Sequence, residues 1–219
     1  MRTLREIGWL LQWELRTEWR NRTALSSVLL YVLVTTTIVY LAMTNFTAMT
    51  FNAVLWIVLF FGALVACARS FLREGGRRHL YYYQLASPEA LLVSKWVINT
   101  ITIWVISGLT YAAISFFAGQ SFLFETEVLL LSLGSGGAGM AAVLTFVAAI
   151  AARAGGNSTL MSILSLPLLI PLLFFLVRLG GYSFGLPIDE HEAMLLYVSA
   201  IGLVSLAVGL VLFPFVWRD

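Results

Sequence analysis

Charged residues are scarce in this chain. Only 11% of its 219 residues are Asp, Glu, Lys or Arg, whereas 60% are hydrophobic. Soluble domains have about 25% charged and roughly 45–50% apolar residues. A soluble protein of this composition would expose too much apolar surface, so the sequence predicts an integral membrane protein. The single cysteine, Cys67, excludes an intrachain disulfide framework.

Several chemical motifs are also missing. A P-loop requires Gly-x-x-x-x-Gly-Lys-Ser/Thr, but the only lysine, Lys95, is followed by Trp96 and has no glycine before it. We therefore expect no enzyme activity, and any ATP hydrolysis belongs to a partner. The two histidines, His79 and His191, are expected on opposite sides of the membrane, so we expect no metal site. Ionisable residues are rare within the apolar stretches, which argues against a proton-driven carrier.

What the chain has in abundance is long apolar runs. A helix of roughly 20 residues crosses a hydrocarbon core about 30 Å thick. Six stretches approach this length, namely residues 24–43, 53–71, 96–117, 128–152, 159–177 and 193–215. The sequence therefore predicts an all-α membrane protein with six transmembrane helices. Without an internal repeat or a low-complexity segment, residues 1–219 are expected to form a single transmembrane domain.

Two of these stretches contain residues that affect helix packing. The fourth holds Gly134, Gly136, Gly137 and Gly139, which permit close approach of helix backbones. The fifth holds Pro167 and Pro171, which lie four residues apart and therefore on one face of a helix. Internal prolines kink helices. The kink either lines a transport pathway or only shapes the packing of the helices.

The distribution of charge predicts the orientation. Basic residues lie before the first stretch, between the second and third, between the fourth and fifth, and at the end of the chain; they are Arg2, Arg5, Arg16, Arg20, Arg22, Arg73, Arg77, Arg78, Lys95, Arg153 and Arg218. The opposite connections are uncharged or acidic, with Glu125, Glu127, Asp189, Glu190 and Glu192. Positive charge marks cytoplasmic loops. Both termini are therefore expected in the cytoplasm.

The first 23 residues differ from a cleaved secretory signal, because a long mixed segment precedes the apolar run. Leu4, Ile7, Leu11 and Leu15 recur at helical spacing, and tryptophans and arginines occupy other positions. This pattern predicts an interfacial helix along the cytoplasmic face of the membrane. The alternative is a simple cytoplasmic cap to the first span.

The most unusual segment is residues 73–95, where charge interrupts the apolar sequence. Ser87, Pro88 and Glu89 resemble a helix start, with an N-cap, a proline at the first position and an acid near the positive end of the helix dipole. The stretch before them is long enough for two to three helical turns. We expect a short cytoplasmic coupling helix there that binds a partner through Glu74, Arg77, Arg78, Tyr81, Tyr82 and Tyr83. Tyrosines are favoured at protein interfaces, although they also anchor helices at the lipid surface.

Two regions carry a resemblance to a known family. The first is "RSFLREGGRRHLYYYQLASPEALLVSKW", and the second is "RAGGNSTLMSILSLPLLIPLLFF", a basic and glycine-containing turn that leads into a proline-containing span. Together with the order and spacing of the spans, they resemble the CcmB family, haem exporter protein B, of the ABC-2-like permeases. Arg77 and Arg78 depart from that family's pattern, in which this loop is more acidic.

The resemblance implies a permease subunit for haem handling in cytochrome c maturation, in the bacterial inner membrane. It implies energy from a separate cytoplasmic ATPase, the A subunit, and work alongside the membrane C and D subunits. Haem would be a transported or handled ligand, and no nucleic acid is expected as a partner. Two alternatives stay open, namely an ABC-2 permease for another substrate and a non-transporting membrane scaffold.

Overall fold

The structure, a computed structural model, describes residues 2–20, 22–43, 47–72, 87–119, 122–154, 158–188 and 190–218. Over these ranges every regular element is an α-helix. The helices are α1 (Arg2–Arg20), α2 (Arg22–Ala42), α3 (Ala48–Leu72), α5 (Pro88–Ala118), α6 (Thr126–Arg153), α7 (Ser158–Ser183) and α8 (His191–Arg218).

Among the described residues, five helices are long and apolar enough to cross a membrane, and these are α3, α5, α6, α7 and α8. The apolar part of α2, Ser26–Ala42, is shorter. The predicted all-α, multi-pass architecture is thereby confirmed. The coupling helix expected between the second and third spans falls in residues 73–86, which lie outside the described ranges.

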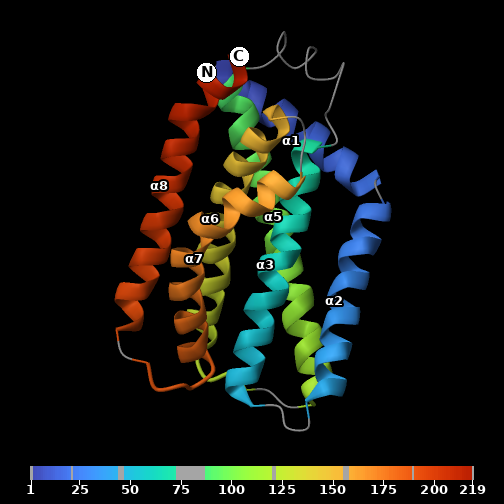
Figure 1. The fold of residues 1–219 in the computed structure, drawn as a ribbon, viewed down its shortest axis with the longest axis vertical. Coiled ribbons are helices and arrows are strands. Elements are labelled where there is room, and N and C mark those ends of the chain that lie inside the picture. Colours follow the sequence, from blue (N-terminus) through green and yellow to red (C-terminus); the bar gives the residue numbers. More distant parts are fainter. Residues whose placement is uncertain are drawn as a thin grey trace.

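The helices from α2 to α8 run alternately up and down along the long axis of the molecule (Figure 1). The two chain ends lie at the same end of this bundle, and α1 lies crosswise there (Figure 1). We call this the termini end, and the other the opposite end. The C-terminus of α3 and the N-terminus of α5 both reach the termini end, so the two boundaries of residues 73–86 lie there.

The core of the bundle is built around α6, which packs against α3, α5, α7 and α8 and is the most buried of the five candidate spans. Its glycines explain how so many helices approach it. A Cβ added to Gly202 of α8 would lie only 3.0 Å from the Gly139 backbone, and one added to Gly137 would lie 2.8 Å from the Trp104 ring. Close helix packing is confirmed for Gly136, Gly137 and Gly139, whereas a Cβ added to Gly134 would meet nothing within 4 Å.

The α7 helix contains both predicted prolines and continues through them. Its ribbon changes direction along its length (Figure 1), as expected for a helix with internal prolines. Pro167 and Pro171 are both exposed on the surface of the chain. They therefore face lipid or a partner, and the pathway role of this kink remains a prediction.

Candidate partner-binding site

The predicted partner-binding residues, Glu74, Arg77, Arg78, Tyr81, Tyr82 and Tyr83, lie outside the described residues. The structure does describe the helices on both sides of them and the side chains that hold those helices together. These contacts decide where the segment begins and ends at the termini end of the bundle.

The α5 helix begins where the sequence predicted, with Ser87 as N-cap in an extended conformation (φ −69°, ψ 146°) and Pro88 at the first helical turn. The hydroxyl of Ser87 makes no capping hydrogen bond to its own helix. Instead, Glu6 of α1 accepts two hydrogen bonds from Ser87 through Oε2, from the backbone N–H at 3.1 Å and from the hydroxyl at 3.0 Å. A carboxylate at this position also complements the positive end of the α5 dipole.

Eight residues further along both helices, a second contact joins α1 and α5. The Nζ of Lys95 lies 2.5 Å from Oε1 of Glu14, and both side chains are buried. Lys95 Nζ also donates a hydrogen bond to the Ser70 carbonyl in the last part of α3, at 3.0 Å. The single lysine of the chain thus joins α1, α3 and α5.

The burial of this ion pair has an energetic consequence. Moving two charges out of water is expensive, and their attraction offsets that cost only when they remain paired. Removal of one partner of a buried pair typically costs about 3–5 kcal/mol. Glu14 is 6% exposed and Lys95 is 1% exposed, so this pair belongs to the class in which loss of one charge is strongly destabilising.

Sequence patterns alone missed the role of Glu6 and Glu14. The expectation placed Lys95 with the charges of the cytoplasmic segment, but the structure buries it within α5. A signal was present for Glu14, which at 3.6 residues per turn lies on the side of α1 opposite Arg5, Trp9, Gln12 and Arg16. Those four residues recur at helical spacing and are all exposed.

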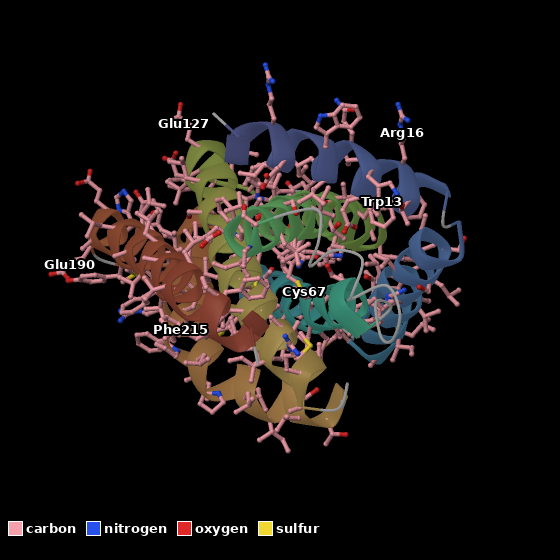
Figure 2. All side chains as sticks on the ribbon, turned by 90° about the horizontal axis from the view of Figure 1, so that it is seen from above. Trp13, Arg16, Cys67, Glu127, Glu190 and Phe215 are labelled. Atoms are coloured by element: carbon pink, nitrogen blue, oxygen red, sulfur yellow. The ribbon has the colours of Figure 1, made fainter. Side chains whose placement is uncertain are left out.

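The exposed side of α1 faces outward from the bundle. Trp9 is 75% exposed and Trp13 43% exposed, and Arg16 points away from the other helices (Figure 2). Tryptophan and arginine are the side chains expected where lipid headgroups meet water. The arrangement supports an interfacial position for α1, with tryptophans outward and carboxylates inward.

A third polar contact joins α2 to the same end. Arg69, in the last turn of α3, donates through a guanidinium NH₂ group to the Ser27 hydroxyl of α2 at 2.6 Å, and its Nε donates to the Val65 carbonyl at 3.3 Å. The ends of α1, α2, α3 and α5 are therefore connected by charged side chains.

The opposite end is built from aromatic rings. Phe51 at the start of α3 is 1% exposed, and its ring centroid lies 4.9 Å from Phe184, 5.7 Å from Tyr111 and 6.0 Å from Phe122. The backbone N–H groups of Phe124 and Glu125 both donate to the Ser183 carbonyl, at 2.9 and 3.1 Å. These contacts fix the connections that close this end.

His191, which the sequence analysis expected on the opposite side of the membrane from His79, begins α8 at the opposite end. Its ring stacks on Tyr182 with the centroids 4.0 Å apart and the planes 8° from parallel. In the parts of the chain that the structure describes, no group of three or more His, Cys, Asp and Glu side chains could hold a metal ion.

Comparison with known protein families identifies the family of this chain. The model of the family described as CcmB protein matches residues 5–216. The chain belongs to the CcmB family. No curated protein matches it. The CcmB family comprises permease-type membrane proteins of haem export for cytochrome c maturation, which are not enzymes and function with other Ccm components in an ABC-type system.

The CcmB match includes all of the polar contacts at the termini end, because Glu6, Glu14, Ser87 and Lys95 all lie between residues 5 and 216. It also includes the aromatic end with Phe51 and Phe184. Both ends are therefore parts of the family's domain rather than appendages to it.

Proposed function

We propose that this chain is the membrane permease subunit of an ABC-type complex that handles or exports haem during cytochrome c maturation. The single observation that carries the proposal is the match of residues 5–216 to the CcmB family. The sequence lacks a P-loop, so the energy comes from a separate cytoplasmic ATPase, the A subunit. The membrane C and D subunits complete the complex.

The proposed topology has six spans in the bacterial inner membrane. As a sixth span, α2 has 21 residues, which at 1.5 Å per residue extend about 32 Å and match a hydrocarbon core of about 30 Å. An even number of crossings agrees with two chain ends at one end of the bundle (Figure 1). The basic residues near that end favour the cytoplasmic side for both termini.

The ATPase contacts the segment between α3 and α5 in this proposal, through Glu74, Arg77, Arg78, Tyr81, Tyr82 and Tyr83. Support comes from the charged and aromatic content of these residues in an otherwise apolar chain. The few hot-spot residues of an interface, among which tyrosine is enriched, cost about 2 kcal/mol or more on truncation. A loss of about 2 kcal/mol lowers affinity roughly thirtyfold.

The test is to replace Tyr82 and Tyr83 with alanine and to measure co-purification of the ATPase and stimulation of its ATP hydrolysis. Both are expected to fall, with normal insertion of the protein in the membrane. Tyr40→Ala is the matched control, because this tyrosine is 42% exposed in the last turn of α2, at the opposite end. If ATPase binding, hydrolysis and cytochrome assembly all stay normal in the Tyr82→Ala/Tyr83→Ala protein, the tyrosines only anchor the segment at the lipid surface.

A further inference from the structure

The α1 helix is attached to α5 at two points, through Glu6 and through Glu14. Its contacts with α5 are in register, because Glu6 and Glu14 are eight residues apart and so are their partners, Ser87 and Lys95. The two helices therefore run in the same direction along their line of contact. Such a double attachment fixes both the position of α1 and its rotation about its own axis.

The same contacts define both boundaries of the segment between α3 and α5. Ser70, which accepts a hydrogen bond from Lys95, lies in the last turn of α3. Ser87, which donates two hydrogen bonds to Glu6, is the residue immediately before α5. Through Lys95 and Glu14, α1 is connected to both boundaries.

We propose that Glu6 and Glu14 are positioning residues through which α1 takes part in energy coupling. Glu6 holds the start of α5 through Ser87, and Glu14 holds Lys95, which also contacts the end of α3 through the Ser70 carbonyl. Together they set the geometry in which the intervening segment meets the ATPase. This inference rests on the proposed function, and it adds α1 to the elements that respond to the ATPase. We call Glu6, Glu14, Ser70, Ser87 and Lys95 the α1 clamp.

The chemistry of the clamp suits such a role better than apolar packing would. Replacement of a buried ion pair by apolar side chains of similar volume is often neutral or stabilising, so stability alone does not require the pair. The two hydrogen bonds from Ser87 to the Glu6 carboxylate are directional, and together with the Lys95–Glu14 ion pair they specify one register between α1 and α5. The outward Trp9 and Arg16 keep α1 at the headgroup level, which prevents α1 from simply following any movement of α5.

The experiment measures the geometry of the α1 clamp separately from the stimulation of ATP hydrolysis. Spin labels are placed on cysteines at Gln12 of α1 and Glu89 of α5, both exposed, in a Cys67→Ala background. The distance distribution is recorded for the purified protein alone, and ATP hydrolysis is recorded for the complex with the ATPase. Both are measured for the starting protein, for Glu14→Gln, for the charge swap E14K/K95E and for the control Glu127→Gln, an exposed glutamate of α6 at the opposite end.

The expected result is that Glu14→Gln broadens the distance distribution and lowers stimulated hydrolysis by about fivefold or more, the lower limit of typical coupling between sites. The charge swap is expected to narrow the distribution again and to recover a large part of the hydrolysis. Glu127→Gln is expected to change neither. Recovery by the swap identifies the pairing itself as the cause, because the swap restores a pair of opposite charges while neither original side chain remains at its position.

Three outcomes overturn the inference, and they are distinguishable. An unchanged distance distribution in Glu14→Gln means that the pair does not position α1. A broadened distribution with full hydrolysis means that α1 is only an anchor. If the starting protein neither binds nor stimulates the ATPase, the proposed function fails and the coupling role of α1 fails with it, although the distance measurement still reports whether the clamp exists.

Discussion

The two ends of the bundle are held together by different physical means. At the termini end, charged side chains join helices that are distant in sequence, as Glu6 and Ser87 do across 81 residues. At the opposite end, aromatic rings pack around Phe51. Loss of one partner of a buried ion pair leaves the other charge buried and uncompensated, whereas loss of one ring from the cluster leaves no buried charge. A substitution or a binding event at the termini end therefore has an electrostatic effect that the aromatic end lacks.

The first test, with the largest expected effect, asks which of the two ends of the bundle faces the cytoplasm. Single cysteines are introduced at Glu190 and at Arg16, both exposed, in a Cys67→Ala background, since Cys67 is buried. A thiol reagent that does not cross the membrane is added to intact cells. We expect labelling of Glu190→Cys and none of Arg16→Cys, because basic residues stay in the cytoplasm.

Permeabilised cells provide the control, in which both positions are expected to react. Labelling of Glu190→Cys only after permeabilisation, together with labelling of Arg16→Cys in intact cells, would invert the topology. The ATPase would then have to meet the acidic and aromatic end of the bundle, and the proposed coupling site would be on the wrong side.

The second test concerns the buried ion pair. Lys95→Met leaves Glu14 buried without its cation, and we expect a loss of about 3–5 kcal/mol in the free energy of unfolding. The double variant Glu14→Leu/Lys95→Met is expected to recover most of that loss, since no buried charge remains. Reversible unfolding in mixed detergent micelles measures both values.

Arg178→Met is the matched control for this substitution. Arg178 is exposed, with its guanidinium carbon 5.7 Å from the centre of the Phe174 ring, and an exposed cation–π contact contributes only about 0.5–1 kcal/mol. If Lys95→Met and Arg178→Met lowered the free energy of unfolding equally, the buried pair at the termini end would not differ from an ordinary surface cation.

The third test addresses the aromatic end. Phe51→Ala removes the central ring of the cluster, and large-to-small substitutions of buried phenylalanine typically cost about 3–5 kcal/mol. We expect a value near the lower limit, about 3 kcal/mol, because Tyr111, Phe122 and Phe184 can still approach one another. The measurement is the same unfolding equilibrium. Phe124→Ala is the control, since this ring is 69% exposed, and a cost above about 0.5 kcal/mol there would exceed that of ordinary surface substitutions.

The architecture was largely predictable, because the length of an apolar run and the residues that cap a helix both depend on residues that are contiguous in the sequence. The apolar runs predicted α3, α5, α6, α7 and α8, and Ser87 with Pro88 predicted the start of α5. The boundaries were less accurate, since α3 begins at Ala48 rather than at residue 53 and α5 extends to Ala118.

The polar contacts were not predictable from the same patterns. Periodicity places Glu14 opposite the exposed residues of α1, but it does not say which of the other helices lies against that side. Lys95 looked like one more charge of a cytoplasmic segment, because its burial depends on packing between α1, α3 and α5. Contacts between segments far apart in the chain require the tertiary arrangement, which one sequence does not contain.

The smallest expected effect belongs to His191 at the opposite end. Its ring stacks on Tyr182 at 4.0 Å, and aromatic pairs contribute roughly 0.5–1.5 kcal/mol beyond their buried area. We expect His191→Ala to lower the free energy of unfolding by about 1 kcal/mol and to leave cytochrome c maturation largely intact, as measured by complementation at normal protein level. His191→Phe keeps the stacking and removes the nitrogens, so it separates packing from ligation. If both variants insert normally and both abolish cytochrome c maturation, the imidazole nitrogens are required, and the opposite end contains a functional site as well as a structural one.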